Sequence, residues 1–379
     1  MSRKQVLFLT SWYPSEENTT LGNFVVKHAL CSAQVANVIV LYAKSTSKVS
    51  EVTIDDRNED GIRVVRVYYP KESLNFPLLS SFKKFRNYKE ALRIGFRHIN
   101  TRFDLVQVNV AFPAGLFALE LKKNYNLPFI ILEHWTGYLS HTNSYKEYPF
   151  FLKNLHKKVF SNADKVLVVS DHLGKSLKSL GLTKEYGVFP NVVDSNYFYP
   201  STDKKNESVL QILHVSSFDD EHKNISGMLA AIASLKRPYH LNLVTESKES
   251  VVNDFLARAG ISVDNTSIKS KLAPKDVGSE MRKSDVLVLF SNYETFSVVI
   301  AEAWMCGIPA AYSQCGGLTE IDNVALGRQL DKKDERSLTI FLESFNSNDY
   351  SMQEIAKYGM AFEKRQLSDK IRDVYDQLC

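Results

Sequence analysis

Glu294 and Glu302 have the residue type and the spacing to act at one crevice. Glu294 follows the apolar run Val286–Phe290, and Glu302 stands eight positions later in the run SNYETFSVVIAEA at residues 291–303. An α-helix turns once in about 3.6 residues, so a helix starting after Glu294 would place Glu302 roughly two turns along it. A loop carboxylate and a helix carboxylate arranged in this way can face the same crevice and accept hydrogen bonds there.

The backbone N–H groups of Phe296, Ser297 and Val298 would open this helix. Unpaired N–H groups and the positive end of the helix dipole make such a helix start a binding site for phosphate. Two acids near a helix start have an alternative explanation, because capping and the dipole favour them without any ligand.

The first half of the chain holds two further candidate positions. Gly22 and Asn23 follow the polar run TSWYP at residues 10–14. The glycine would let the backbone approach a phosphate and the asparagine would hydrogen-bond to it, unless the pair forms an ordinary turn. His134 follows the apolar run Phe129–Leu132. This histidine would orient a substrate or assist proton transfer, or else it packs at the end of a strand.

Residues 82–99 combine an apolar stripe with a basic face. The apolar residues recur at every third or fourth position: Phe82, Phe85, Tyr88, Leu92, Phe96 and Ile99. The basic residues supply much of the rest: Lys83, Lys84, Arg86, Lys89, Arg93 and Arg97. Such a helix packs its stripe on a sheet, contacts an anionic membrane, or does both when the basic face meets headgroups. Residues 82–102 are the candidate segment for peripheral membrane contact.

The elements that position these residues alternate between strands and helices. Apolar or β-branched runs predict strands at residues 6–10, 38–41, 62–67, 105–108, 129–132, 165–169, 209–215, 241–245, 286–290 and 309–312. Helical patterns occur at residues 24–35, 114–123, 150–160, 225–235, 251–259, 276–283, 298–305 and 352–378. Buried strands that alternate with helices predict parallel sheets covered on both faces. Ligands bind such sheets beyond the carboxyl ends of the strands.

Composition favours a folded protein with two domains. The chain has 379 residues, 44% of them hydrophobic and 24% charged, which suits two α/β domains. Neither a signal-peptide pattern nor a run of about 18 apolar residues occurs, so we expect a cytoplasmic protein, with or without association with the inner face of a membrane. The four cysteines lack the paired spacing of a disulfide framework or a zinc site.

Charge is distributed unevenly along the chain. Residues 1–200 hold 26 Lys and Arg against 17 Asp and Glu, whereas the remainder holds 21 against 26. A basic half predicts an anionic partner, such as a lipid surface or a phosphorylated acceptor. Nucleic acid is disfavoured, because the sequence has no zinc-finger, helix-turn-helix or RNP-type signature.

The run from Glu294 to Glu320 resembles the retaining GT-B glycosyltransferases of glycosyltransferase family 4 (glycosyl transferases group 1). The family pattern is Glu, seven residues and Glu, followed by a small-residue helix, Gly-x-Pro and a Gly-Gly loop. Here the later part reads AWMCGIP at residues 303–309 and GGLTE at residues 316–320. The resemblance implies an α/β chain of two tandem Rossmann-like doubly wound domains, the GT-B fold, with a central cleft.

The resemblance also implies roles for individual residues. Glu294 would contact hydroxyls of the transferred sugar and support the positive charge that develops at its anomeric carbon. Glu302 would accept hydrogen bonds from the ribose of the nucleotide. Lys223 occupies the position of a lysine that neutralises the donor diphosphate, although a solvated lysine at a helix start is the alternative. His134 occupies the position of a histidine near the acceptor and the reacting sugar.

Ser217 departs from the family pattern, because it stands where the family places an arginine on the same diphosphate. The missing charge would have to come from His214, from His222 or from a basic residue of the other domain.

These arguments predict an organisation and an activity. The domains are an acceptor-binding domain at residues 1–195, a linker at 196–206, a nucleotide-sugar-binding domain at 207–350 and a helical segment at 351–379 that ends the second domain or crosses back to the first. We expect retaining transfer of a hexose from a UDP- or GDP-linked donor to a glycan or lipid-linked acceptor in bacterial surface polysaccharide or glycan assembly, without a metal or cofactor. A sugar-nucleotide epimerase of the same fold and a non-catalytic sugar-nucleotide-binding protein are the alternatives.

Overall fold

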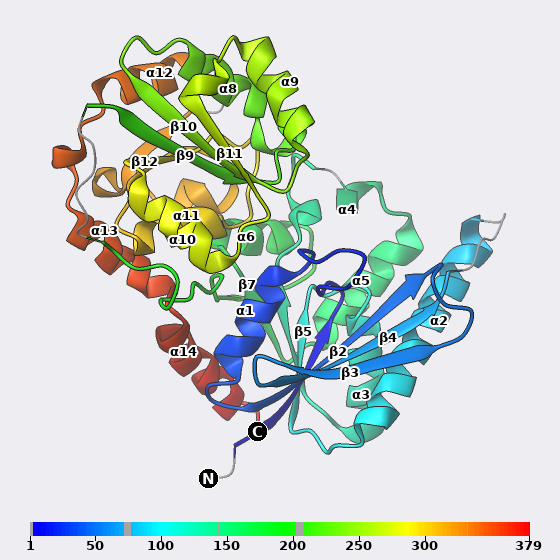
Figure 1. Cartoon of the computed structure of the whole chain (residues 1–379). Helices are drawn as coiled ribbons and strands as arrows, with labels where there is room; N and C mark the ends of the chain where they lie inside the picture. The colour runs from blue at the N-terminus through cyan, green and yellow to red at the C-terminus, as the bar shows by residue number, and fades with distance from the viewer. Residues whose placement is uncertain (1–2, 72–76, 143, 202–207, 332) are drawn as a thin grey trace. The chain divides into compact units, whose positions relative to one another are not determined.

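The computed structural model of the chain describes residues 3–71, 77–142, 144–201, 208–331 and 333–379, with the backbone alone for residues 77–82. The chain forms two compact units, coloured along the chain in Figure 1. Unit 1 consists of Met1–Val192 and Lys364–Cys379, and unit 2 of Val193–Glu363. Each unit is an α/β domain built on its own sheet, which confirms the predicted fold class.

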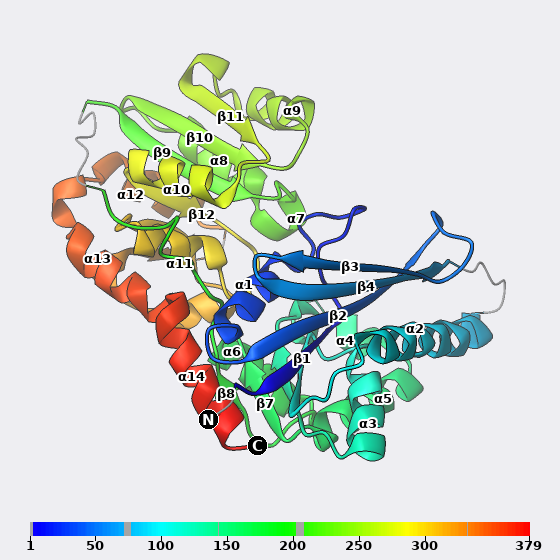
Figure 2. The same ribbon diagram turned by 60° about the horizontal axis from the view of Figure 1, so that its bottom comes forward.

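Unit 1 carries its sheet in the order β3-β4-β2-β1-β5-β6-β7-β8. Its strands are β1 (Gln5–Thr10), β2 (Asn37–Thr46), β3 (Thr53–Glu59), β4 (Ile62–Pro70), β5 (Leu105–Asn109), β6 (Phe129–Glu133), β7 (Lys165–Val168) and β8 (Gly187–Val188). Its helices are α1 (Asn23–Ser32), α2 (Pro77–Ile99), α3 (Gly115–Tyr125), α4 (Ser144–Glu147), α5 (Phe150–Asn162), α6 (Asp171–Ser179) and α14 (Lys364–Asp376). Helices α1 and α14 cover one face of the sheet, and α2, α3 and α5 cover the other (Figure 2).

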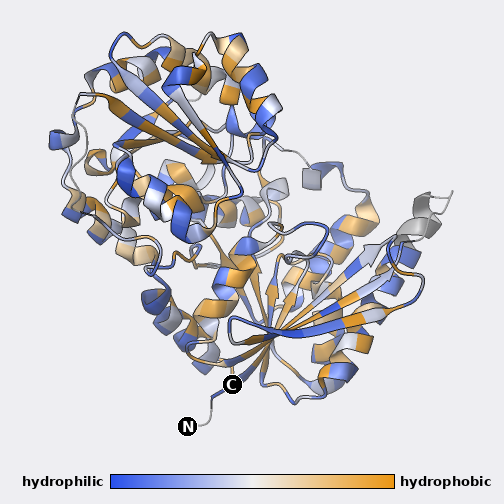
Figure 3. Cartoon of the chain, viewed as in Figure 1, coloured by the Kyte–Doolittle hydropathy of each residue, from blue (hydrophilic) through white to orange (hydrophobic). Residues whose placement is uncertain are grey.

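Strand β3 corrects the expectation of a purely parallel sheet, because it pairs antiparallel with β4. Its sequence, TIDDRNE, is polar and half exposed, so no apolar run marks it; these residues are largely blue in Figure 3. Across the hairpin, Arg63 lies 2.8 Å from Asp56. The turn is Asp60-Gly61, and both residues have positive φ, as a two-residue type I′ hairpin requires.

Unit 2 carries a parallel sheet in the order β11-β10-β9-β12-β13-β14. Its strands are β9 (Leu210–Ser216), β10 (Tyr239–Thr245), β11 (Thr266–Ser270), β12 (Val286–Leu289), β13 (Ala310–Ser313) and β14 (Gly327–Leu330). Its helices are α7 (Asp220–Lys223), α8 (Ile225–Ala233), α9 (Glu249–Ala259), α10 (Pro274–Lys283), α11 (Val298–Met305), α12 (Glu335–Ser344) and α13 (Met352–Gly359). Helices α10, α11 and α13 pack on one face, and α8, α9 and α12 on the other.

The C-terminal stretch, predicted as one helix over residues 352–378, is broken. A 3-10 turn at Met360–Phe362 and an extended Glu363 separate α13 from α14. Helix α14 belongs to the core of unit 1, where the Tyr375 hydroxyl lies 2.9 Å from Ser32 Oγ and 2.7 Å from Gln107 Oε1. The chain therefore returns to unit 1 after completing unit 2.

The predicted linker at residues 196–206 lies partly outside the described residues, which stop at residue 201 and resume at 208. Within the described part, Phe198 is buried in the core of unit 2. No helix in the described parts of the chain has both the length and the apolar character needed to cross a membrane.

Candidate active site

Two loops at the carboxyl edge of the unit 2 sheet are braced against each other. One follows β9 and the other follows β12. The His222 ring stacks on the Tyr293 ring with centroids 4.3 Å apart, and His222 Nε2 lies 2.9 Å from the Tyr293 carbonyl oxygen. The Asn292 N–H donates to the His222 carbonyl at 2.9 Å. Several contacts therefore fix the two loops relative to each other.

This bracing brings Lys223 and Glu294 together. Lys223 Nζ lies 2.6 Å from Glu294 Oε1, and Ser291 Oγ donates to the same oxygen at 2.9 Å. The Lys223 and Glu294 side chains are 14% and 8% exposed, so the pair is largely withdrawn from water. Two predicted catalytic residues, one from each loop, thus form one ion pair.

A glycine loop holds the Glu294 backbone from the other side. Gly316 has a φ of +53°, and a Cβ at this position would lie 1.5 Å from the Glu294 carbonyl oxygen. The Gly317 N–H donates to that same oxygen at 3.4 Å. A side chain at position 316 would push Glu294 out of place, so the chain requires glycine here.

Helix α11 begins at Val298, directly after Ser297, as the sequence predicts. Ser297 is the N-cap residue, and its Oγ accepts from the Ile300 N–H at 3.4 Å. Neither predicted carboxylate serves as the cap. Glu302 is buried in the second turn, and the Phe296 ring packs edge-on against Phe362 at 5.2 Å. The capping explanation for the two acids therefore does not apply.

Ser217, at the departure from the family pattern, is exposed at the end of β9. Its carbonyl accepts from Ser247 Oγ at 2.9 Å, which ties it to the loop after the neighbouring strand β10. Lys248 follows Ser247 directly and begins α9 as its N-cap residue. A lysine therefore stands in the loop adjacent to the missing arginine.

His214 is poorly suited to supply the missing charge, which argues against one of the predicted compensations. Its ring is fully buried, Nδ1 donates to the Val288 carbonyl at 2.9 Å and Nε2 lies 2.7 Å from Ser216 Oγ. Burial lowers the pKa of His214 to about 4. His222 is unsuited as well, because burial and the nearby Lys223 lower its pKa. Both imidazoles are neutral at pH 7.

In unit 1, Gly22 serves the packing of the chain on itself. It is the N-cap residue of α1 with a φ of +81°, and a Cβ would lie 2.6 Å from the Trp12 carbonyl oxygen. Glycine at this position therefore allows the start of α1 to pack closely against the backbone that follows β1. Asn23, the first residue of α1, is exposed. Phosphate binding by these two residues stays a prediction.

His134 lies at the carboxyl end of β6 in an aromatic setting. Its ring centroid is 4.3 Å from that of Phe24 and 5.1 Å from that of His28. Neither ring nitrogen of His134 has a hydrogen-bond partner among the described residues. Burial, with a smaller contribution from His28, lowers the pKa of His134 well below its ordinary value, and the nearby Asn191 side chain opposes that fall. A neutral imidazole with unsatisfied nitrogens is suited to hydrogen-bond a sugar hydroxyl.

Glu133 holds the loop that carries His134, a role that sequence reasoning missed. Its fully buried carboxylate accepts from the N–H groups of Ala111, His134 and Trp135 at 2.8–2.9 Å. Burial raises the pKa of Glu133, and the three N–H donors oppose that rise. An acid ending a wholly apolar strand was the available signal, because such a side chain must find partners inside the protein.

Helix α2 packs its predicted stripe on the sheet. Tyr88, Leu92 and Ile99 are buried, while the side chain of Phe82 lies outside what the structure describes. On the basic face, Arg93 pairs with Glu120 at 2.6 Å. The stripe belongs to the core, and membrane contact through residues 82–102 stays a prediction.

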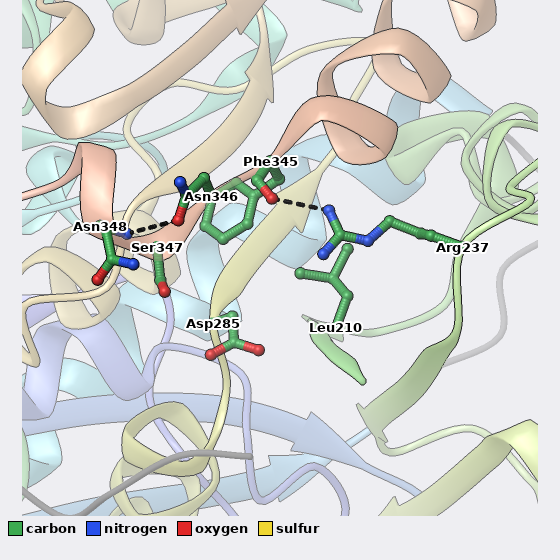
Figure 4. A pocket seen from close by; sticks show the side chains of 7 residues that line it. All are labelled: Leu210, Arg237, Asp285, Phe345, Asn346, Ser347 and Asn348. Carbon is green, nitrogen blue, oxygen red and sulfur yellow. Dashed lines mark hydrogen bonds between the residues drawn. The ribbon is translucent and has the colours of Figure 1, made fainter. Parts of the chain in front are cut away.

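A cavity of about 220 Å³ lies at the opposite edge of the unit 2 sheet, where β9 and β12 begin (Figure 4). Arg237 points along it and donates to the carbonyl groups of Leu342, Glu343 and Phe345. Asp285 accepts from the Gln211 N–H at 2.9 Å. These groups hold the end of α12 and the start of β9, so the cavity is a packing feature away from the predicted donor site.

The fold is that of known glycosyltransferase structures. Over 99% of both chains, it matches sucrose-phosphate synthase from Thermosynechococcus elongatus at 17% identity, with a TM-score of 0.77. It also matches Anabaena HepE, solved in complex with UDP and glucose, at 14% identity over 99% of this chain and 100% of that one, with a TM-score of 0.69.

Two family models match separate parts of the chain. Glycosyltransferase Family 4 matches residues 28–197 and Glycosyl transferases group 1 matches residues 210–340. These findings support a glycosyltransferase with the GT-B fold. The first match includes His134 but begins after Gly22 and Asn23, and the second includes Lys223, Glu294 and the other predicted residues of unit 2.

Relatives agree with this assignment. An uncharacterised glycosyltransferase of Methanocaldococcus jannaschii is 26% identical over 312 residues, covering 80% of this chain and 84% of its own. The MMP α-(1→4)-mannosyltransferase of Mycolicibacterium hassiacum is 30% identical over 137 residues, 35% of this chain and 32% of its own.

Proposed function

We propose that this glycosyltransferase moves a hexose from a UDP- or GDP-linked donor to an acceptor with retention of anomeric configuration, in bacterial polysaccharide or glycan assembly. The observation that carries the proposal is the Lys223–Glu294 pair beside the start of α11. A cation and a helix N-terminus at one edge of a sheet suit the diphosphate of a nucleotide sugar. A carboxylate beside them suits the sugar and the positive charge that develops on it during transfer.

Each group of unit 2 then has a task in the reaction. The donor diphosphate approaches the start of α11 and draws Lys223 toward itself, which releases Glu294 to the hydroxyls of the sugar. Glu302, in the second turn of α11, accepts hydrogen bonds from the ribose. The acceptor oxygen attacks on the face that the diphosphate leaves, and the departing phosphate oxygen takes its proton.

Lys248 supplies the second cation for the diphosphate. Strands β9 and β10 pair in parallel as far as Ser216 and Thr245, so the loops that follow them are neighbours. The contact between Ser247 and Ser217 joins these loops at the position where the resembled family has its arginine. A lysine from the adjacent loop replaces that charge without restoring the arginine's two-pronged hydrogen bonding.

The geometry of unit 1 suits the acceptor. His134 is neutral, and neither of its ring nitrogens makes a well-formed hydrogen bond in the described chain, although the Asn191 side chain lies close to the ring. Glu133 accepts from the backbone N–H groups of His134 and Trp135, which fixes the loop that carries His134. His134 therefore orients a hydroxyl by hydrogen bonding, with Glu133 as its positioning residue.

Donor hydrolysis tests the reaction without knowledge of the acceptor. The protein is incubated with each UDP- and GDP-hexose, and the released sugar is followed by proton NMR before mutarotation. We expect the anomer of the donor to be released, and Glu294→Gln to lose this activity while Glu354→Gln, on the exposed face of α13, keeps it. Release of the opposite anomer contradicts retention. A new nucleotide sugar without release identifies an epimerase, and binding without turnover identifies a binding protein.

A further inference from the structure

A cavity of about 330 Å³ lies in unit 1 at the carboxyl ends of β2 and β4, beside α2. The Tyr88 hydroxyl, on its wall, lies 3.3 Å from the Thr10 carbonyl oxygen at the end of β1. This is the edge at which open α/β sheets bind ligands, and His134 ends another strand there. The volume is within the range of small-molecule sites, about 300–1,000 Å³.

Lysines give this cavity its charge. Lys71, Lys83 and Lys84 line it, and the described lining includes no carboxylate. Lys71 and Lys84 are exposed, and neither has a carboxylate within ion-pair distance in the part of the chain that the structure describes. Among the described residues, no carboxylate neutralises Lys71 or Lys84 at the mouth of the cavity.

Three other cations of the same helix, Lys89, Arg93 and Arg97, are paired with carboxylates of the protein. Lys89 lies 3.0 Å from Glu120, and Arg97 lies 3.1 Å from Glu90. Glu90 also pairs with Arg93 at 2.8 Å, so it is engaged along the helix. Lys84 differs from these residues, because no carboxylate of the described chain pairs with it. An external anion could therefore bind at this end of α2.

Aromatic side chains form the wall behind the lysines. Tyr69 and Phe85 are half-buried and Tyr88 is buried. Aromatic rings offer apolar faces to a sugar or an isoprenoid body. Lysines at the mouth and rings within suit a ligand with an anionic head on a less polar body.

We propose that this cavity binds the phosphate or diphosphate group of the acceptor. The proposal rests on the proposed function, because it assigns the acceptor's chemical class: a phosphorylated sugar or a lipid-linked diphosphate. The donor diphosphate has its own site in unit 2, so the two anions are bound by different lysines. Lys71 and Lys84 fix the anionic end of the acceptor at the edge of the sheet that also carries His134.

Lysine acetylation of the whole wild-type protein, read residue by residue by mass spectrometry, tests this site. The probes are inorganic pyrophosphate, phosphatidylcholine vesicles containing a polyprenyl diphosphate, and phosphatidylcholine–phosphatidylglycerol vesicles. We expect pyrophosphate or the diphosphate vesicles to slow acetylation of Lys71 and Lys84 at least threefold. The exposed Lys157 and Lys158 of α5 serve as controls and keep their rates.

The probes also identify the source of the phosphate. Protection by pyrophosphate but not by the diphosphate vesicles indicates a soluble acceptor. Protection by the diphosphate vesicles, but not by phosphatidylglycerol vesicles, indicates a lipid-linked one. Protection by phosphatidylglycerol vesicles without protection by pyrophosphate overturns the proposal in favour of membrane docking. Equal protection of Lys157 and Lys158, or no protection with any probe, also overturns it. Acetylation of Lys223 in the presence of nucleotide sugars reports donor binding separately. A wrong donor site would therefore appear at Lys223, and a wrong acceptor site at Lys71 and Lys84.

Discussion

Lys223 and Glu294 lie 71 positions apart in the chain, yet Lys223 Nζ is 2.6 Å from Glu294 Oε1. Each follows a different strand of one parallel sheet, and the stacked His222 and Tyr293 rings set the distance between the two loops. Each of the two largely buried side chains gives the other its counter-charge. The two residues that we propose to act on the donor are thus held by their own ion pair.

Removing the lysine should affect turnover and stability together. We expect Lys223→Met to lower turnover about 100-fold, as loss of a preorganised electrostatic group does, and to destabilise unit 2 by about 3 kcal/mol, because Glu294 loses its counter-charge. Urea unfolding and donor hydrolysis measure the two effects. The double variant Lys223→Met/Glu294→Gln should recover much of the stability and none of the activity. An additive double variant would show that the pair is not coupled.

Gly316 should be needed for space as well as for backbone conformation. We expect Gly316→Ala to destabilise unit 2 by at least about 2 kcal/mol and to impair hydrolysis, because its Cβ would collide with the Glu294 carbonyl. Gly260→Ala is the matched control, since Gly260 also has positive φ but nothing within 4 Å of its Cβ position. That variant should cost about 1 kcal/mol and leave activity unchanged. Equal costs in urea unfolding would argue against the collision.

Buried histidines should make the protein less stable in mild acid. Burial lowers the pKa of His28, His156 and His214 from 6.5 to about 4, and that of His134 also falls. Between these values the unfolded chain binds more protons, so the free energy of unfolding should fall from pH 7 to pH 4.

Urea titrations between pH 7 and pH 4 measure how steeply the free energy of unfolding falls with pH. Each histidine contributes up to about 1.4 kcal/mol per pH unit. Glu133 opposes the trend above pH 4.5, because its pKa is raised in the folded state. His156→Gln should remove the contribution of one proton to this slope, about 1.4 kcal/mol per pH unit. An unchanged slope would contradict the lowered pKa of His156.

Lys248 should contribute to donor binding. We expect Lys248→Gln to weaken donor affinity about three- to tenfold and to make it less sensitive to salt, because an exposed cation acts through a screened charge. Lys357→Gln, on α13, is the matched control and should leave affinity unchanged. Calorimetric titration at two salt concentrations measures both effects. Identical affinity in Lys248→Gln and wild type would assign the missing arginine's role to another residue.

Much of the fold was predictable because buried strands carry apolar runs. Val286–Leu289, Ser297 at the helix start and Val298–Met305 all lie where the pattern predicts them. Strand β3 was missed because an exposed edge strand needs no apolar run, although the Asp60-Gly61 turn was visible beside it. The break after α13 depends on packing into two different cores, which one amphipathic pattern does not reveal.

The candidate site was predictable in part. The residue types of Glu294, Glu302 and Lys223 stood out from motif and spacing. Their contacts did not, because the Lys223–Glu294 distance depends on how two loops brace across the sheet. His214 illustrates the same limit, since only the structure shows both of its nitrogens engaged.

We propose that unit 2 binds a nucleotide sugar with Glu302 on the ribose. Titration of wild type and Glu302→Ala with UDP, GDP, ADP and their 2′-deoxy counterparts, with thermal unfolding as the readout, tests this binding mode. We predict that one ribonucleotide stabilises the wild type, that its 2′-deoxy form binds at least about tenfold more weakly, corresponding to about 1.4 kcal/mol, and that Glu302→Ala loses this preference. An undiminished preference in Glu302→Ala, or no stabilisation of the wild type by any nucleotide, would contradict the account.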